Sequence, residues 1–533
     1  MTSSHPNHWQ QIPQDAYRDE AHFGDRVVRC FKDRTPNAYA LFAAACEAQP
    51  DAEALVCGDA RLTYAQAAAS ADRIAANLAK CGLAPGMRIA LLLGNRIEFV
   101  TALLGILRLG GIAVPLGTRL QKPELEYILN NVGAAALIHE ASLAERLPDQ
   151  AALPALKHRF SVGGETDAYK PFALLEQSAP SAAPHAPREE DAAVILYTSG
   201  TTGHPKGAML SHLNIVHSTQ HFQRCMALDV RDRSLLAVPG SHVTGLIAVI
   251  MTMWQAGGAT VIMPEFKARD FAPLAARERV SYSILVPAMY NLCLMQPDFD
   301  SYDLSAWRIG GYGGAPMPEA TIDALAAKLP NLQLMNAYGA TETCSPTTIM
   351  PAQFTRSHGD SVGLPVPCGD ILVVDADGRE VAAGETGEIW IRGPMVVQGY
   401  WENEKATRDS FTAGYWHSGD VGSIDKDGFL RIFDRLKDMI NRGGYKVFSV
   451  EVENVLMSHP AIAEAAVVGE PCPVLGERVK AIVSLRDAAV SAQNISEFCA
   501  QRLSDYKVPE KIILLETPLP RNANGKILKR ELR

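Results

Sequence analysis

The sequence lacks several features that would place it in a special class of protein. Its ten cysteines, scattered from Cys30 to Cys499, form no CxxC pair and no Cys/His spacing typical of a metal site. Disulfide-stapled and zinc-dependent folds are therefore not indicated, and a reducing compartment is favoured. Basic residues are outnumbered by acidic ones, 50 to 59, which excludes an overall basic surface for nucleic acid or anionic lipid. We expect no nucleic-acid partner.

The N-terminal stretch MTSSHPNHWQQIPQDAYRDE lacks the apolar region of a secretory signal. We therefore expect residues 1–30 to form a flexible leader and the protein to be cytoplasmic. One run, residues 245–263, is long and uncharged enough to suggest a membrane helix. Gly257-Gly258 divides it into a helix-length piece and a short β-branched strand, which favours a buried α/β unit and no stable membrane insertion.

The order of apolar segments indicates the fold class and the domains. Helix, Gly-Gly and buried strand occur in that order at residues 99–116 and again at 245–263, which predicts two similar α/β halves with mostly parallel sheets. Composition shifts after residue 365 to short strands separated by turns. The last stretch alternates helices and strands in the manner of a small α+β domain. We predict an α/β protein with a large domain over 31–436, including a β-rich subdomain, and a C-terminal domain over 437–533.

The strongest local motif is YTSGTTGHPKG, residues 197–207, between a predicted strand and a predicted helix. Its glycines allow backbone N–H groups to approach a polyphosphate, its hydroxyls add donors, and Lys206 adds positive charge. The loop is not a P-loop, because Pro205 stands at the second glycine position and Gly207 follows the lysine. A nucleotide triphosphate is the ligand that this composition predicts.

Two further segments complement this loop. Residues 310–316, GGYGGAP, are rich in glycine, and NAYGATET, residues 336–343, combines an aromatic ring, a hydroxyl and a carboxylate. Tyr338 could stack on a base, Thr341 could hold a phosphate, and Glu342 could bind Mg²⁺. Taken alone, the glycines also fit a tight turn and the carboxylate a surface position.

Together these motifs resemble the adenylate-forming superfamily, which comprises acyl-CoA synthetases, luciferases and the adenylation domains of peptide synthetases. The resemblance runs from Phe31 to Arg533. Besides the phosphate loop, six motifs occur in the order of the family: PGSHVTG from Pro239, NAYGATET from Asn336, GETGEIWIRG from Gly384, YWHSGD from Tyr415, DRLKDMINRGGYKV from Asp434 and PRNANGKILKREL from Pro520.

The resemblance implies a role for each matching residue. The adenine would lie between residues 313–315 and Tyr338, the α-phosphate would contact Thr341, and Glu342 would bind Mg²⁺. Asp420 and Arg435 would hold the ribose. The residues that it assigns to ATP and CoA are Thr198, Ser199, Gly200, Thr201, Thr202, Lys206, Gly313, Gly314, Ala315, Asn336, Ala337, Tyr338, Asp420, Arg435, Lys437, Gly443, Gly444 and Lys446.

By the same resemblance, Lys526 is the catalytic lysine and Lys437 the hinge of a mobile C-terminal domain. The carboxylate attacks the α-phosphorus of ATP to give an acyl-adenylate, and a thiolate then displaces AMP. A lysine suits the first step because two anions must approach each other. Gly443, Gly444 and Lys446 would line the pantetheine tunnel in the second step.

The motifs look most like those of CoA ligases, so CoA is the preferred thiol. A carrier protein as acceptor, luciferase-type oxidation and a nucleotide-binding pseudoenzyme remain alternatives, and a homodimer is compatible with the sequence. His242 corresponds to the gate of the acyl pocket, although Ser241 departs from the usual Phe before it. The expected pocket walls are Val243, Thr244, Gly310, Gly311, Ala337, Ser345, Pro346 and Thr347. NAYGATET has no tryptophan, which acetate-specific relatives carry there, and no arginine at Asn336 or Ala337, where malonate-specific relatives place one, so acetate and dicarboxylates are disfavoured. The small wall residues leave room for a medium or long fatty acid or an aromatic acid.

Overall fold

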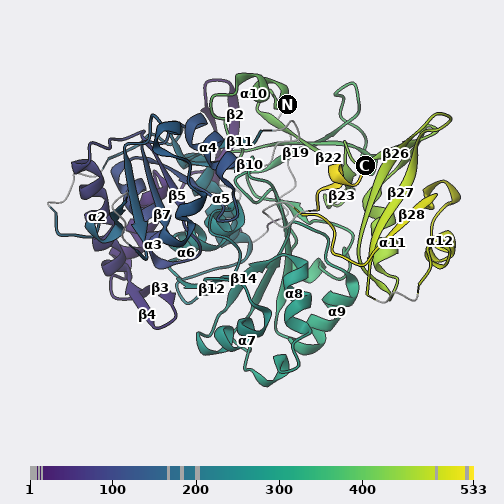
Figure 1. The fold of residues 1–533 in the computed structure, drawn as a ribbon, viewed down its shortest axis with the longest axis horizontal. Helices are drawn as coiled ribbons and strands as arrows, with labels where there is room; N and C mark the ends of the chain where they lie inside the picture. The colour runs from purple at the N-terminus through teal and green to yellow at the C-terminus, as the bar shows by residue number, and fades with distance from the viewer. Residues whose placement is uncertain are drawn as a thin grey trace. The chain divides into compact units, whose positions relative to one another are not determined.

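Two large and mostly parallel β-sheets organise the N-terminal two thirds of the chain (Figure 1). The computed structural model describes Trp9, Ile12, Pro13 and residues 16–164, 169–179, 185–198, 204–486, 490–521 and 527–533. The chain divides into two units. The first comprises Met1–Ile371, Ile391–Trp416 and Gly428–Leu430, and the second comprises Leu372–Trp390, His417–Asp427 and Arg431–Arg533.

The first sheet has seven strands in the order β11-β10-β6-β5-β7-β8-β9. All neighbouring pairs are parallel except β10 and β11, which form a hairpin around the predicted phosphate loop. The strands are β5 (Arg88–Leu92), β6 (Ile112–Pro115), β7 (Ala136–Glu140), β8 (His158–Val162), β9 (Lys170–Pro171), β10 (Ala192–Thr198) and β11 (Lys206–Ser211).

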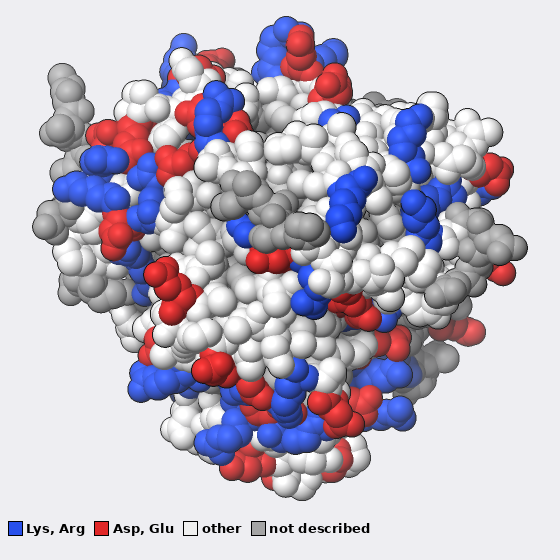
Figure 2. Space-filling view, turned by 90° about the vertical axis from the view of Figure 1, so that its left-hand side faces the viewer, with Lys and Arg blue, Asp and Glu red and all other residues white. Residues whose placement is uncertain are grey.

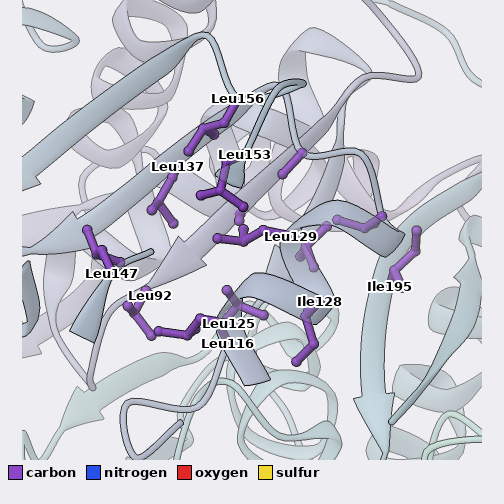
Figure 3. Packing of buried hydrophobic residues seen from close by; sticks show 14 of the residues in the cluster. Leu92, Leu116, Leu125, Ile128, Leu129, Leu137, Leu147, Leu153, Leu156 and Ile195 are labelled. Carbon is purple, nitrogen blue, oxygen red and sulfur yellow. The ribbon is translucent and has the colours of Figure 1, made fainter. Parts of the chain in front are cut away.

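Helix α4 (Lys122–Asn131) packs on this sheet through one apolar face. Leu125, Ile128 and Leu129 follow the spacing of a helix face and meet Leu92 and Leu137 from the strands (Figure 3). Burial of each such side chain contributes about 1.5–3 kcal/mol, so this cluster fixes the position of the helix. Helices α1 (Ala38–Ala48), α2 (Tyr64–Lys80) and α3 (Ile97–Leu109) precede β11 in the first unit, and α5 (His212–Cys225) directly follows it.

The second sheet has nine strands in the order β18-β17-β16-β15-β14-β12-β13-β3-β4, with a parallel centre and antiparallel edges. The strands are β3 (Glu53–Cys57), β4 (Ala60–Thr63), β12 (Arg233–Leu236), β13 (Ala259–Ile262), β14 (Tyr282–Leu285), β15 (Ile309–Tyr312), β16 (Gln333–Tyr338), β17 (Thr348–Ile349) and β18 (Leu364–Pro365). The associated helices are α6 (Thr252–Ala256), α7 (Ala268–Arg277), α8 (Pro287–Leu294) and α9 (Glu319–Lys328).

The predicted repeat is confirmed. Gly110 caps the C-terminal end of α3, and Gly257 caps that of α6. Both glycines have left-handed backbone angles, and a buried strand follows each of them. A π-helix, η5 (Thr244–Met251), precedes α6, and its residues 245–251 are fully buried. Among the described residues, no helix is both long enough and apolar enough to cross a membrane.

Part of the expected flexible leader is instead an ordered hairpin, so that expectation is wrong for residues 17–30. Strands β1 (Tyr17–His22) and β2 (Arg26–Phe31) pair along their whole length. The reason is burial: Val28 and Cys30 alternate with more exposed residues and pack against Leu213 of α5, and the backbone N–H of Phe31 donates to His217 of the same helix.

Two smaller sheets follow in the sequence. The third has the order β19-β20-β22-β21 with β23 beside β22, and its strands are β19 (Asp370–Val374), β20 (Gly387–Arg392), β21 (Phe411–Thr412), β22 (Tyr415–Ile424) and β23 (Leu430–Arg435). Helix α10 (Glu404–Ser410) precedes β21. The β-rich segment after residue 365 is thus confirmed.

The fourth sheet has the order β25-β24-β27-β26 with β28 beside β27. Its elements are β24 (Ile440–Arg442), β25 (Tyr445–Val447), α11 (Ser449–Met457), β26 (Ile462–Cys472), β27 (Gly476–Leu485), α12 (Ala492–Ala500) and β28 (Lys511–Leu515). A separate apolar core over Val452, Leu456, Val467, Val483 and Ile495 supports this α+β region. The domain boundary at Lys437 stays a prediction, because the second unit also contains 372–390 and 417–427.

Candidate active site

The predicted adenine residues lie at the carboxyl ends of two neighbouring strands of the second sheet, β15 and β16. Tyr312 of β15 is in register with Asn336 of β16, and burial raises the pKa of Tyr312 to about 12. A Cβ at Gly313 would lie 2.4 Å from the carbonyl oxygen of Ala337, so only glycine permits this approach. The carboxyl ends of parallel strands are a common ligand site in α/β proteins, and the structure brings residues 313–315 and 336–338 together there.

A tight turn after β16 carries the predicted phosphate and metal residues. The hydroxyl oxygen of Thr343 accepts a hydrogen bond from the backbone N–H of Ala340 at 2.9 Å, and the N–H of Cys344 donates to the carbonyl of Thr341 at 3.0 Å. These bonds fix the backbone locally. They leave Thr341 half-buried and Glu342 buried, with 9% of its surface exposed.

The Glu342 carboxylate is held by one neighbour. Tyr400 donates its hydroxyl to Oε1 of Glu342 at 2.9 Å. Burial, and then the nearby carboxylate, raise the pKa of Tyr400, so its hydroxyl remains a donor. Oε2 of Glu342 has no hydrogen-bond donor within the described part of the chain. A carboxylate with one oxygen left available suits a hard cation such as Mg²⁺, so the site fits the metal that the motifs imply.

The hairpin β10–β11 delivers the ends of the phosphate loop. Thr198 pairs with Lys206 across the hairpin, and its hydroxyl donates to the Lys206 carbonyl at 3.4 Å. The Lys206 ammonium lies 4.9 Å from the centre of the Tyr400 ring, a cation–π contact. Tyr400 therefore contacts both the loop lysine and Glu342. The predicted residues Ser199, Gly200, Thr201, Thr202 and Lys526 lie outside the described residues.

The predicted gate, His242, is half-buried in the turn before η5. The backbone N–H of His242 donates to the carbonyl of Pro239 at 3.1 Å, and the backbone carbonyl of His242 accepts from the N–H of Leu246 at 2.8 Å. A Cβ at Gly245 would lie 2.3 Å from the Pro239 carbonyl oxygen, so this turn requires glycine. The turn is thus fixed by backbone bonds, which hold His242 at the start of the π-helix.

Two of the predicted pocket walls serve packing. A Cβ at Gly310 would lie 2.9 Å from the Tyr290 hydroxyl, and one at Gly311 would lie 3.1 Å from Ile284. Tyr290 donates to the Gly311 carbonyl at 2.8 Å. A larger side chain at either position would therefore meet protein atoms, and the role of these glycines in the acyl pocket stays a prediction.

In the second unit, the predicted ribose residues form an ion pair. Arg435 Nε lies 2.8 Å from Oδ1 of Asp420; the Asp420 side chain is 8% exposed and that of Arg435 is 48% exposed. The N–H of Asp420 donates to Ser418 Oγ at 3.0 Å, which orients the turn. The two oxygens of a carboxylate offer several acceptor sites, which suits the two vicinal hydroxyls of a ribose.

The remaining predicted residues also lie in the second unit. Arg533 donates to the Lys437 carbonyl at 2.7 Å, and burial lowers the pKa of Lys437. Gly443 and Gly444 form the turn between β24 and β25 with positive φ, and Lys446 is exposed on β25. The glycines leave the tip of this turn free of side chains.

Sequence reasoning missed Tyr400, which stands 58 positions after Glu342. The segment GPMVVQGYW carries no charged or nucleophilic residue that would draw attention to it. Only an alignment or a structure relates it to Glu342.

Comparison with known proteins decides the family. The model described as "AMP-binding enzyme" matches residues 42–401, and "AMP-binding enzyme C-terminal domain" matches residues 451–526. The chain belongs to the AMP-binding enzyme family. This AMP-binding enzyme is 38% identical to a long-chain-fatty-acid–CoA ligase of Mycobacterium tuberculosis, over 89% of this chain and 93% of the relative. It is 34% identical to a feruloyl-CoA synthase of Amycolatopsis sp, over 91% and 96%.

Solved structures agree with this assignment. An anthranilate CoA ligase in complex with anthranoyl-AMP superposes with a TM-score of 0.86 at 28% identity, covering 93% of this chain and 96% of that one. An o-succinylbenzoate CoA synthetase from Bacillus subtilis, in complex with ATP and magnesium ion, has a TM-score of 0.84 at 30% identity, covering 94% and 100%. The expected fold and the expected class of adenylate-forming CoA ligases are confirmed.

Proposed function

We propose that this AMP-binding enzyme converts a carboxylic acid, ATP and CoA into an acyl-CoA, AMP and pyrophosphate through an acyl-adenylate. The observation that carries the proposal is that one unit contains the predicted adenine residues beside Gly313, the Glu342 carboxylate and the ends of the phosphate loop. The similar proteins named as CoA ligases support it.

The residues divide the work of the first step. Thr198, Lys206 and the loop between them bind the phosphates, and Gly313 and Tyr338 hold the adenine. Asp420 accepts hydrogen bonds from the ribose, and Arg435, which pairs with Asp420, lies beside it. When bound, Mg²⁺ neutralises phosphate charge, and Glu342 is the residue that would hold it. Binding and orientation of the acid and ATP supply most of the rate acceleration, and no covalent enzyme intermediate is needed.

Lys526 and Thr341 act where negative charge gathers on the α-phosphorus. His242 would gate the entry of the acid. For the second step, rotation of the C-terminal domain about the hinge at Lys437 would bring Gly443, Gly444 and Lys446 to the pantetheine arm. The substrate is a medium- or long-chain fatty acid or an aromatic acid, in line with the fatty-acid and feruloyl names of the relatives.

The cytoplasmic location is part of this proposal. All ten cysteines are free, and six of them are buried, as in proteins of a reducing compartment. Fractionation of the native host tests the location. Sedimentation of the purified chain tests the homodimer, with which the proposal is compatible.

The decisive experiment incubates the purified chain with Mg-ATP and octanoate, palmitate, benzoate or ferulate, with and without CoA. Pyrophosphate and thioester are measured. We expect thioester only with CoA and loss of adenylation in Lys526→Ala, while the exposed Lys426→Ala control retains activity. Pyrophosphate release without thioester under all conditions would instead favour a carrier-protein acceptor. Nucleotide binding without either product would favour a pseudoenzyme.

A further inference from the structure

A segment after β20, residues 394–401, runs beside the strand that follows the phosphate loop; we call it the strap. Within it, the carbonyl of Gly399 accepts a hydrogen bond from Met209 at 3.1 Å, and the N–H of Trp401 donates to Gly207 at 2.8 Å. Both partners lie on β11, directly after Lys206. The strap therefore extends the hairpin that carries the phosphate loop.

The strap also contacts the turn that carries Glu342, through two hydrogen bonds. The N–H of Val397 donates to the carbonyl of Glu342 at 2.9 Å, and the hydroxyl of Tyr400 donates to its carboxylate at 2.9 Å. The first bond fixes the backbone and the second fixes the orientation of the carboxylate. Tyr400 is 5% exposed, and a hydrogen bond from a buried hydroxyl to a carboxylate is among the stronger kinds.

The N-terminal hairpin holds the strap from its other side. Arg26 of β2 is 7% exposed, and its guanidinium donates to the carbonyls of Val397 at 3.1 Å and Gln398 at 3.2 Å. Asn214 of α5 donates to the carbonyl of Val396 at 3.0 Å. A planar guanidinium can reach adjacent carbonyls at once, which an ammonium cannot do in the same geometry.

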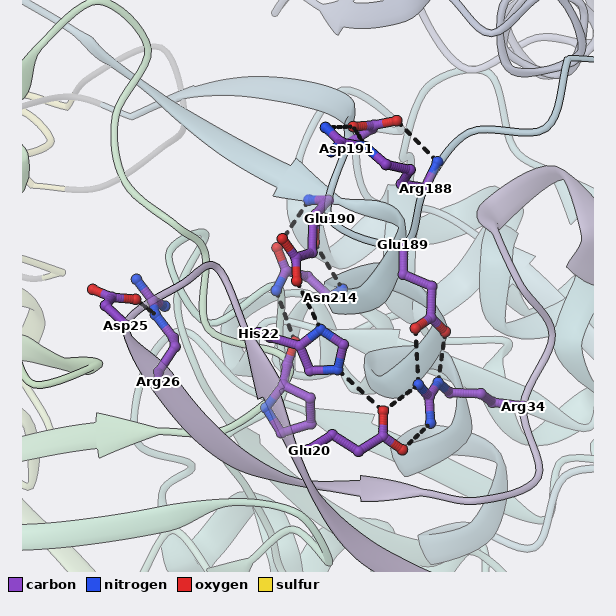
Figure 4. A network of polar contacts seen from close by, with 12 residues as sticks. Glu20, His22, Asp25, Arg26, Arg34, Arg188, Glu189, Glu190, Asp191 and Asn214 are labelled. Atoms are coloured by element: carbon purple, nitrogen blue, oxygen red, sulfur yellow. Dashed lines mark hydrogen bonds and ion pairs between the residues drawn. The ribbon is translucent and has the colours of Figure 1, made fainter.

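Ion pairs in turn fix the hairpin (Figure 4). The Arg34 guanidinium pairs with Glu20 of β1 and with Glu189, whose Oε1 lies 2.7 Å from Arg34 Nε. The His22 ring contacts the carboxylates of Glu20 and Glu190. The polar side chains around Arg34 therefore tie β1 to the segment that leads into β10. The hairpin, residues 17–31, lies before residue 42, where the match to the family model begins.

We propose that the strap is a positioning device for Glu342, in which Tyr400 orients the carboxylate and Arg26 anchors the strap. The inference rests on the proposed function, in which Glu342 takes part in binding Mg²⁺ with ATP. Tyr400 and Arg26 are positioning residues, since they act through Glu342 and not on the substrate. Partners that orient a metal ligand typically change metal affinity or activity by about 10–100-fold when removed.

The first test is Tyr400→Phe, which removes the hydroxyl and keeps the ring beneath Lys206. Tyr64→Phe is the matched control, because Tyr64 is buried and donates its hydroxyl to the Gly258 carbonyl at 2.7 Å away from these residues. Calorimetry with α,β-methylene ATP, with and without Mg²⁺, measures nucleotide affinity without turnover. We expect Tyr400→Phe to leave the metal-free affinity unchanged and to lower the Mg²⁺-dependent gain about tenfold or more. The control should retain the full gain.

The second test is Arg26→Lys, combined with Tyr400→Phe in a double-mutant cycle. If both residues act through the strap, Arg26→Lys alone lowers the Mg²⁺-dependent gain, and the double variant loses little more of it than Tyr400→Phe alone. Additive losses would overturn the role of Arg26, and a full gain in Tyr400→Phe would overturn the whole inference. A wild-type chain without any Mg²⁺-dependent gain would overturn the assignment of Glu342 itself, and the inference with it.

Discussion

The substitution Gly313→Ala tests most directly whether adenine binds beside residues 313–315. The added Cβ would lie 2.4 Å from the carbonyl oxygen of Ala337, whereas ordinary contacts begin at 3.4 Å, so the backbones at Gly313 and Ala337 must move apart by 3.4 − 2.4 = 1.0 Å. Such overpacking costs about 1–3 kcal/mol of stability. A displacement of about 1 Å at a reacting centre can lower the rate about 100-fold.

The assay is acid-dependent exchange of pyrophosphate into ATP, together with thermal unfolding. We expect Gly313→Ala to lower kcat/KM for ATP by about 10–100-fold while the chain still unfolds cooperatively. Gly359→Ala is the control, because its Cβ would meet only the Thr355 carbonyl oxygen, at 3.8 Å. Unchanged ATP kinetics in Gly313→Ala would refute the placement of adenine beside these residues.

Three further predictions test other parts of the molecule. Asp420→Asn should weaken ATP binding about tenfold or more in calorimetry, because it removes the ion pair with Arg435 and a charged acceptor; equal affinity would contradict the ribose role. The hydrogen bonds from Arg34 lower the pKa of Glu20 to about 2, below its usual 4.5. The stabilisation by Glu20 is therefore complete above about pH 4.5 and is lost as the pH falls toward 2, so urea unfolding of wild type and Glu20→Gln should converge over that range. Leu129→Ala should cost about 2–5 kcal/mol of unfolding free energy in the same assay without changing KM for ATP.

The charge pattern of the surface is mixed. Lys and Arg are interspersed with Asp and Glu on the face shown in Figure 2. Mixed charges of this kind give weak long-range fields, which salt screens over about 10 Å at 0.1 M.

Local sequence determined much of the fold. The strand at Ala192–Thr198, the repeated helix, glycine and strand, and the C-terminal α+β elements were all predicted, because each depends on periodicity and turn residues close together in the chain. The candidate site was also largely predicted, since its motifs are short and contiguous. Gly313 and Glu342 were assigned by the family resemblance of all the motifs together, because each segment taken alone also fits a turn or a surface position.

Tertiary structure decided the contacts between distant segments. Tyr400 reaches Glu342 across 58 positions, and Arg26 reaches Val397 across 371. Residues 17–30 of the ordered hairpin were predicted as a leader, because the burial of the hairpin depends on α5, far away in the sequence. Likewise, the space beside Gly310 is filled by Tyr290, which no local pattern reveals. Periodicity reports which residues are buried, but the partner that buries or orients a side chain is fixed only when the chain folds.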